Sequence, residues 1–128
     1  MTLIKPFRAL RPAPARAAEV IAPPYDVLSS AEARDRANGR PWSFLHVSKA
    51  EIDLDPAVDA YDRAVYAKAA ENLRRMIEAG VLVRDGAPCY YAYRLTWRDR
   101  VETGFAAVAS IAAYAENRIR KHELTTPA

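Results

Sequence analysis

The chain has 128 residues, a formal net charge of +3, and a composition of 51% hydrophobic and 27% charged residues, which is typical of one soluble globular domain. Its basic residues are scattered, and no apolar run approaches the roughly 20 residues of a membrane helix, so we expect neither a nucleic-acid nor a membrane partner. Cys89 is the single cysteine, which excludes an internal disulfide and favours a cytoplasmic location.

The first half of the chain predicts short elements separated by proline and polar turns. Residues 3–10 alternate enough to form a strand, and residues 43–47 predict a second one. Ser29 and Glu32 have the spacing of a capping box, which predicts a helix that ends near Asn38-Gly39. The acidic stretch 51–59 predicts a loop.

The second half predicts one long helix followed by strands. Apolar residues recur at helical spacing over 61–79, and Leu73 and Ile77 are expected to be buried there, with Gly80 ending the helix. Strands are expected over 81–84, 88–97 and 101–111, the last with Gly104 as a candidate bulge. This order predicts one α+β domain over residues 1–128, with a mainly antiparallel or mixed sheet and helices packed on one face. The abrupt, charged carboxyl end suggests an amino-terminal fragment of a longer protein.

The best candidate site in the sequence is the charged segment near its end. His122 and Glu123 offer a group that titrates near neutral pH beside a carboxylate, so both are candidate catalytic residues. Arg120 and Lys121 add positive charge that suits an anionic small-molecule substrate, and Thr125 is a candidate substrate contact. The alternative is a solvated, charged strand end.

Three residues in the first half are further candidates. Asp26 follows a stiff Pro-Pro-Tyr segment and could orient a base, bind a metal or cap the next helix. Tyr25 could stack on a ligand or pack in the core, and His46 could face a cleft or be a half-buried structural residue. The widely spaced cysteine and two histidines do not form a zinc motif.

We expect the loop 23–26 and the segment 122–123 to lie near each other, because both are rich in polar groups that a fold does not need for stability and both adjoin strands. In that arrangement Glu123 is the candidate base and His122 a proton carrier. Two unrelated surface turns are the alternative.

Several segments together resemble the bacterial family called domain of unknown function 1015. The matching segments are 6–12, 22–28, 42–47, 80–85, 89–96 and 121–125. Members of this family are longer than the present chain, so the resemblance implies that the remainder of the full-length chain is a partner of this part. Some members are linked with serine biosynthesis.

The chain also resembles, more loosely, the ParB and sulfiredoxin type of nucleotide-binding fold. Proteins with this fold include a nucleotide-dependent kinase of free serine. The similarity implies a nucleotide as cofactor and phosphoryl transfer to or from a serine-like hydroxyl as the reaction. The rival hypothesis is a non-catalytic ligand-binding or assembly domain. A charged cleft favours the enzyme, and a flat apolar face favours assembly.

Overall fold

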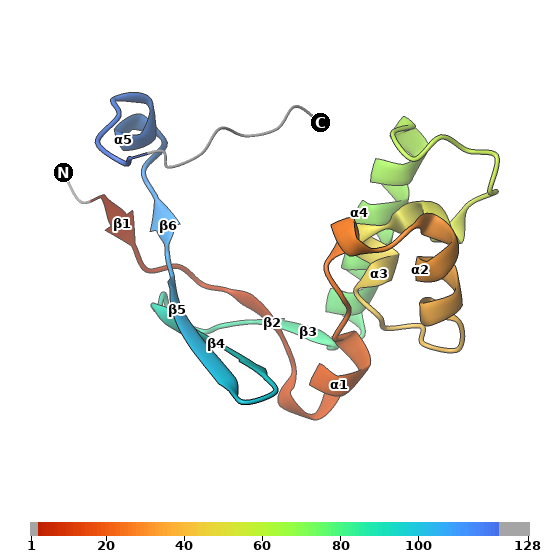
Figure 1. The fold of residues 1–128 in the computed structure, drawn as a ribbon, viewed down its shortest axis with the longest axis horizontal. Coiled ribbons are helices and arrows are strands. Elements are labelled where there is room, and N and C mark those ends of the chain that lie inside the picture. The colour runs from red at the N-terminus through yellow and green to blue at the C-terminus, as the bar shows by residue number, and fades with distance from the viewer. Residues whose placement is uncertain (1–2, 121–128) are drawn as a thin grey trace. The chain divides into compact units, whose positions relative to one another are not determined.

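The computed structural model describes residues 3–120, and these divide into two compact units. The helical unit comprises residues 10–84, and the hairpin unit comprises the described parts of 1–9 and 85–128 (Figure 1). The elements of the helical unit are, in order, β2 (Leu10–Pro12), η1 (Pro14–Arg16), α1 (Ala17–Val20), η2 (Tyr25–Val27), α2 (Ser30–Ala37), α3 (Leu45–Ser48), η3 (Ala50–Asp53), α4 (Arg63–Glu78) and β3 (Leu82–Arg84). Those of the hairpin unit are β1 (Ile4–Lys5), β4 (Tyr91–Trp97), β5 (Arg100–Ala106), β6 (Val108–Ala109) and α5 (Ile111–Ala115).

The capping box predicted at the start of α2 is confirmed. The Ser29 hydroxyl accepts from the backbone N–H of Glu32, and the Glu32 carboxylate accepts from the backbone N–H of Ser29. The carboxylate accepts from both the backbone N–H and the hydroxyl of Ser29, and these two hydrogen bonds lower the pKa of Glu32 below its ordinary value. The helix ends where expected, since Gly39 has a φ of +70°, which a residue with a side chain rarely adopts.

The long helix α4 is also confirmed, although the residues it buries differ from those expected. Asp62 caps it by accepting from the backbone N–H of Ala64, and Gly80 follows it with a φ of +66°. Its buried residues are Val65, Asn72 and Met76. Leu73 is half-buried, and the prediction for Ile77 is wrong because its side chain is 41% exposed. The buried face is therefore rotated away from Ile77 and includes one polar residue.

The core of the helical unit has two apolar clusters. Met76 of α4 packs with the buried side chains of Val20, Val81 and Leu82. The second cluster joins α2 to α3 and η3, and its buried members are Ala33, Ala37, Leu45 and Ile52. The small alanine side chains on one face of α2 allow close packing against the segment 45–53.

The strand predicted over 43–47 is wrong, because these residues lead into the short helix α3. The Ser43 hydroxyl accepts from the backbone N–H of Leu45, and the Phe44 backbone oxygen accepts from the N–H of Ser48. Alternation over only five residues does not distinguish a strand from one helical turn, and burial of Leu45 against α2 decides the outcome.

The acidic stretch was only partly predicted correctly. Its start forms η3, and Glu51 there is buried, which the expectation of a solvated loop missed. The following part turns as expected, since Asp55 and Asp59 each accept a hydrogen bond from the backbone N–H two residues later.

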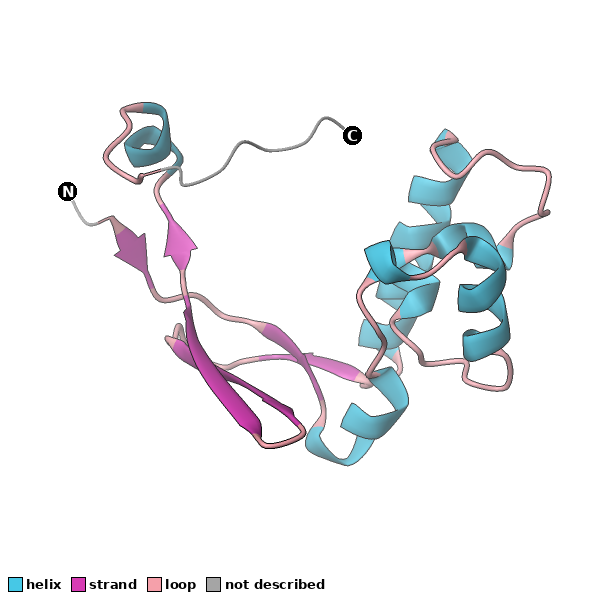
Figure 2. Cartoon of the chain, in the orientation of Figure 1, coloured by secondary structure: helices cyan, strands magenta, loops and turns pink. Residues whose placement is uncertain are grey.

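The described strands all pair antiparallel, in three two-stranded sheets (Figure 2). In the helical unit β2 pairs with β3, and α4 contacts β3. In the hairpin unit β1 pairs with β6 and β4 with β5. The predicted α+β fold class is thus confirmed. The expectation of a single domain stays a prediction.

The strand predictions hold for β3 and β4, with three corrections. The single strand expected over 101–111 is two strands, β5 and β6, and Ile111 begins the helix α5. The single strand expected over 3–10 is two short strands, β1 and β2, with an isolated bridge from Phe7 to Cys89 between them. Gly104 forms no bulge, because it pairs directly with Tyr93 in an uninterrupted register.

Tyr91 links the amino-terminal segment of the hairpin unit to β4. Its hydroxyl accepts from the backbone N–H of Ala9 at 2.9 Å and lies within hydrogen-bond distance of the Asp85 carboxylate. Burial, followed by the neighbouring carboxylate, raises the pKa of Tyr91.

The burial of Met76 and the exposure of Ile77 predict different losses of stability when each side chain is truncated. Met76→Ala removes a fully buried side chain and should lower the free energy of unfolding by about 2–5 kcal/mol, because a cavity remains. Ile77→Ala, at the exposed neighbour, should cost clearly less. Urea denaturation of the two variants measures both values. Equal losses would contradict the assigned burial.

Candidate functional site

The candidate site is a polar pocket in the helical unit, with a volume of about 540 Å³. It lies beside the end of α2, the loop 38–41, α3 and η3. Its lining includes the charged residues Arg34, Asp35, Arg40 and Asp53, and also His46. We call it the His46 pocket.

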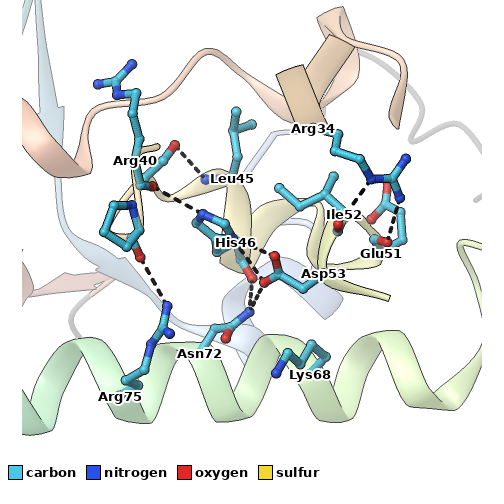
Figure 3. A network of polar contacts seen from close by, with 12 residues as sticks. Arg34, Arg40, Leu45, His46, Glu51, Ile52, Asp53, Lys68, Asn72 and Arg75 are labelled. Carbon is cyan, nitrogen blue, oxygen red and sulfur yellow. Dashed lines mark hydrogen bonds and ion pairs between the residues drawn. The ribbon is translucent and has the colours of Figure 1, made fainter. Parts of the chain in front are cut away.

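His46 is held at this pocket by acceptors on both sides of its ring. Its Nδ1 lies 2.8 and 3.0 Å from the two carboxylate oxygens of Asp53, and its Nε2 lies 3.2 Å from the backbone oxygen of Arg40 (Figure 3). The two contacts at opposite nitrogens fix the orientation of the imidazole ring.

Asn72 fixes the carboxylate that holds this ring. Its side chain is buried in α4, and its Nδ2 donates to the backbone oxygen of His46 at 2.7 Å and to Oδ2 of Asp53 at 2.8 Å. Figure 3 shows Asn72 rising from α4 to the Asp53 carboxylate. Farther along α4, Arg75 donates to the backbone oxygen of Pro41 at 3.0 Å. The helix therefore supports the pocket through two side chains that make three hydrogen bonds.

The two arginines of the pocket are held by neutral acceptors. Arg34 donates through Nε to the backbone oxygen of Ile52 at 3.2 Å, and Arg40 donates through Nη2 to that of Ala18 at 3.2 Å. Within residues 3–120 neither guanidinium forms an ion pair with a carboxylate. Their charge is consequently available to an anion, while the exposed Asp35 places a negative charge on the same rim.

Near this pocket, η3 also carries the buried carboxylate of Glu51. Its Oε1 accepts from the Ser30 hydroxyl at 2.7 Å and lies 3.1 Å from the Lys49 ammonium. Burial alone raises the pKa of Glu51, but the Ser30 hydroxyl, the backbone and Lys49 together outweigh it, so the pKa lies below its ordinary value of 4.5.

The sequence-predicted site residues are only partly brought together by the described structure. His46 lines the polar pocket, whereas Tyr25 and Asp26 lie exposed in η2, and Tyr25 lines a different pocket. Arg120 is exposed in the hairpin unit. Lys121, His122, Glu123 and Thr125 lie outside the described residues, so their roles and their proximity to the loop 23–26 stay predictions.

Sequence reasoning missed four residues of this site, namely Arg34, Arg40, Asp53 and Asn72. One signal was present for Asn72, because it interrupts an apolar helical stripe that includes Val65, Ala69 and Met76. A polar residue on a buried helix face needs a hydrogen-bond partner. The arginines carry no such signal, because nothing in their spacing separates them from solvated ones.

Comparisons with known proteins define the family. The chain belongs to the family described as "Protein of unknown function (DUF1015)", whose model matches residues 4–128. No curated protein and no solved structure shows a significant match. The similarity to the ParB and sulfiredoxin type of fold therefore stays a prediction.

None of the helices in the described part of the chain is both long and apolar enough to cross a membrane. Within 3–120, no group of three or more histidine, cysteine or acidic side chains is arranged to hold a metal ion.

Removal of the Asn72 amide should destabilise the helical unit. Asn72→Leu keeps a similar volume but removes the amide donor to the His46 backbone oxygen and one donor to the Asp53 carboxylate, which should cost about 1–3 kcal/mol of unfolding free energy. Glu71→Leu, at the exposed neighbour, is the matched control and should change stability by about 0.5 kcal/mol or less. Chemical denaturation that shows no difference between the two would contradict the assigned network.

The lowered pKa of Glu51 predicts that the stability of the fold falls when this carboxylate becomes protonated at low pH. Because its pKa is lower in the folded chain than the ordinary value of 4.5, the ionised carboxylate stabilises the fold above that pH, and the contribution is lost as the pH falls below it. Glu51→Gln should therefore be less stable than the unmodified chain at pH 7, and the difference should shrink toward pH 3. Denaturation curves at several pH values test this, and a difference that grows on acidification would contradict it.

Proposed function

We propose that the His46 pocket binds a small metabolite that carries both an anionic group and an ammonium group, such as serine or phosphoserine. The observation that carries this proposal is the pairing of Arg34 and Arg40 with neutral carbonyls rather than carboxylates. Guanidinium groups bind phosphate and carboxylate in a bidentate manner, and Asp35 on the same rim suits an ammonium group.

The reaction we propose is phosphoryl transfer to or from a serine-like hydroxyl, with a nucleotide as the second substrate. Such a reaction depends mainly on positioning and on neutralising phosphate charge, which the two arginines can supply. The ring of His46 is held in place here, since both its nitrogens are engaged, and it helps to shape the pocket. Glu123 stays a candidate base from the sequence alone, and the cytoplasm is the proposed location.

An assembly role is the second candidate, and a separate observation favours it. An apolar groove of about 490 Å³ lies in the helical unit, and its lining includes Leu10, Ile21, Phe44 and Leu73. Apolar surfaces of this kind serve as contact sites for other polypeptides. No residue that lines this groove also lines the His46 pocket, so the two roles are compatible.

The binding proposal predicts that Arg40 contributes to the affinity for phosphoserine. Arg40→Gln should weaken phosphoserine binding at least about tenfold, because a charged donor to the anion is lost. Arg36→Gln, which alters an exposed arginine of α2 that does not line the pocket, is the matched control and should bind normally. Isothermal titration calorimetry with phosphoserine, serine and inorganic phosphate measures the dissociation constants.

Two outcomes would contradict the proposal. One is the absence of binding of all three compounds to the unmodified chain. The other is equal weakening in Arg36→Gln and Arg40→Gln, which would indicate attraction by general surface charge. The reaction itself is tested by ³¹P NMR of the full-length protein with serine and a nucleoside triphosphate, and phosphoserine is the expected product.

A further inference from the structure

A second pocket of the helical unit has an aromatic rim. Its volume is about 260 Å³, and it is lined by residues of η2, α3, η3 and α4 and of the segments between them. Three tyrosines, Tyr25, Tyr61 and Tyr66, reach it together with Lys49 and Glu51. None of these five residues lines the His46 pocket. We call it the tyrosine pocket.

The three tyrosines are largely exposed to solvent. Tyr25 is 63% exposed, Tyr61 is 74% exposed and Tyr66 is 62% exposed. Within the described residues, no ring contact involves any of the three. They therefore contribute little to the core, and their faces are available for stacking on a ligand.

The tyrosine pocket has an apolar wall and a pair of oppositely charged groups. Val65 and Ala69 of α4 supply apolar surface, while the Lys49 ammonium and the buried Glu51 carboxylate lie 3.1 Å apart. Ser30 and Lys49 both contact the same carboxylate oxygen, Oε1, and an ionised carboxylate has about four acceptor positions. The pair thus offers a donor and an acceptor side by side with no net charge.

We propose that the tyrosine pocket binds the base of a nucleoside or nucleotide. The edge of a nucleobase presents a hydrogen-bond donor next to an acceptor, which the Glu51 carboxylate and the Lys49 ammonium complement. Its two faces stack on tyrosine rings, as bases do on aromatic side chains in other proteins. A volume of about 260 Å³ suits one base rather than a whole nucleoside triphosphate.

The charge of the pocket argues against a small organic cation as the ligand. Aromatic cages for ammonium groups combine rings with unpaired negative charge. Here Lys49 neutralises Glu51 and would repel a second cation. A flat, uncharged ring avoids that repulsion.

This inference rests on the proposed use of a nucleotide, but it can fail separately. A nucleoside carries no phosphate, so its binding depends on the tyrosine pocket and not on Arg34 or Arg40. Phosphoserine carries no base, so its binding tests only the His46 pocket.

The test uses adenosine, guanosine, cytidine and uridine with the unmodified chain and with Tyr61→Ala and Tyr66→Ala. Saturation-transfer NMR detects binding, and titration gives the dissociation constants. We expect at least one nucleoside to bind, and each variant to weaken that binding at least about fivefold. Both tyrosines are exposed, so their removal should leave the fold intact.

Tyr93→Ala is the matched control, because Tyr93 is 61% exposed and belongs to the hairpin unit. It should bind the nucleoside as the unmodified chain does. The inference is overturned if no nucleoside binds at its solubility limit, or if the three variants weaken binding equally. Phosphoserine binding that persists in either case would leave the proposed function standing.

Discussion

The buried amide of Asn72 is the constraint on which the helical unit depends. From one position on α4 it donates to the backbone of α3 and to the carboxylate of Asp53 in η3. Asp53 then orients the ring of His46, which in turn contacts the backbone of Arg40. A buried polar group without partners is costly, so this chain of contacts permits few alternative arrangements of the segment 40–53.

The same constraint shapes the two pockets that carry the functional proposals. On one face of the segment 45–53, His46 and Asp53 line the polar pocket with Arg34 and Arg40. Other residues of this segment, Lys49 and Glu51, line the tyrosine pocket. One short stretch of chain, held by several hydrogen bonds, therefore supplies polar groups to both pockets.

The sequence predicted the elements that local signals define and missed those that burial decides. The Ser29–Glu32 capping box and the period of α4 are encoded locally, and both were located correctly. The segment 43–47 is helical because Leu45 packs against α2, a contact that no five-residue pattern reveals. At the site only His46 was foreseen, since Asp53 and the arginines gain their roles from neighbours more than five residues away in sequence.

A double-mutant cycle between Asp53 and Asn72 tests this account most directly. Unfolding free energies of Asp53→Ala, Asn72→Ala and the double variant give the coupling between the two side chains. The account predicts a coupling of about 0.5–3 kcal/mol, because either single substitution already breaks the shared network. Effects that add to within about 0.3 kcal/mol would contradict it and would show that Asn72 and Asp53 stabilise the fold independently.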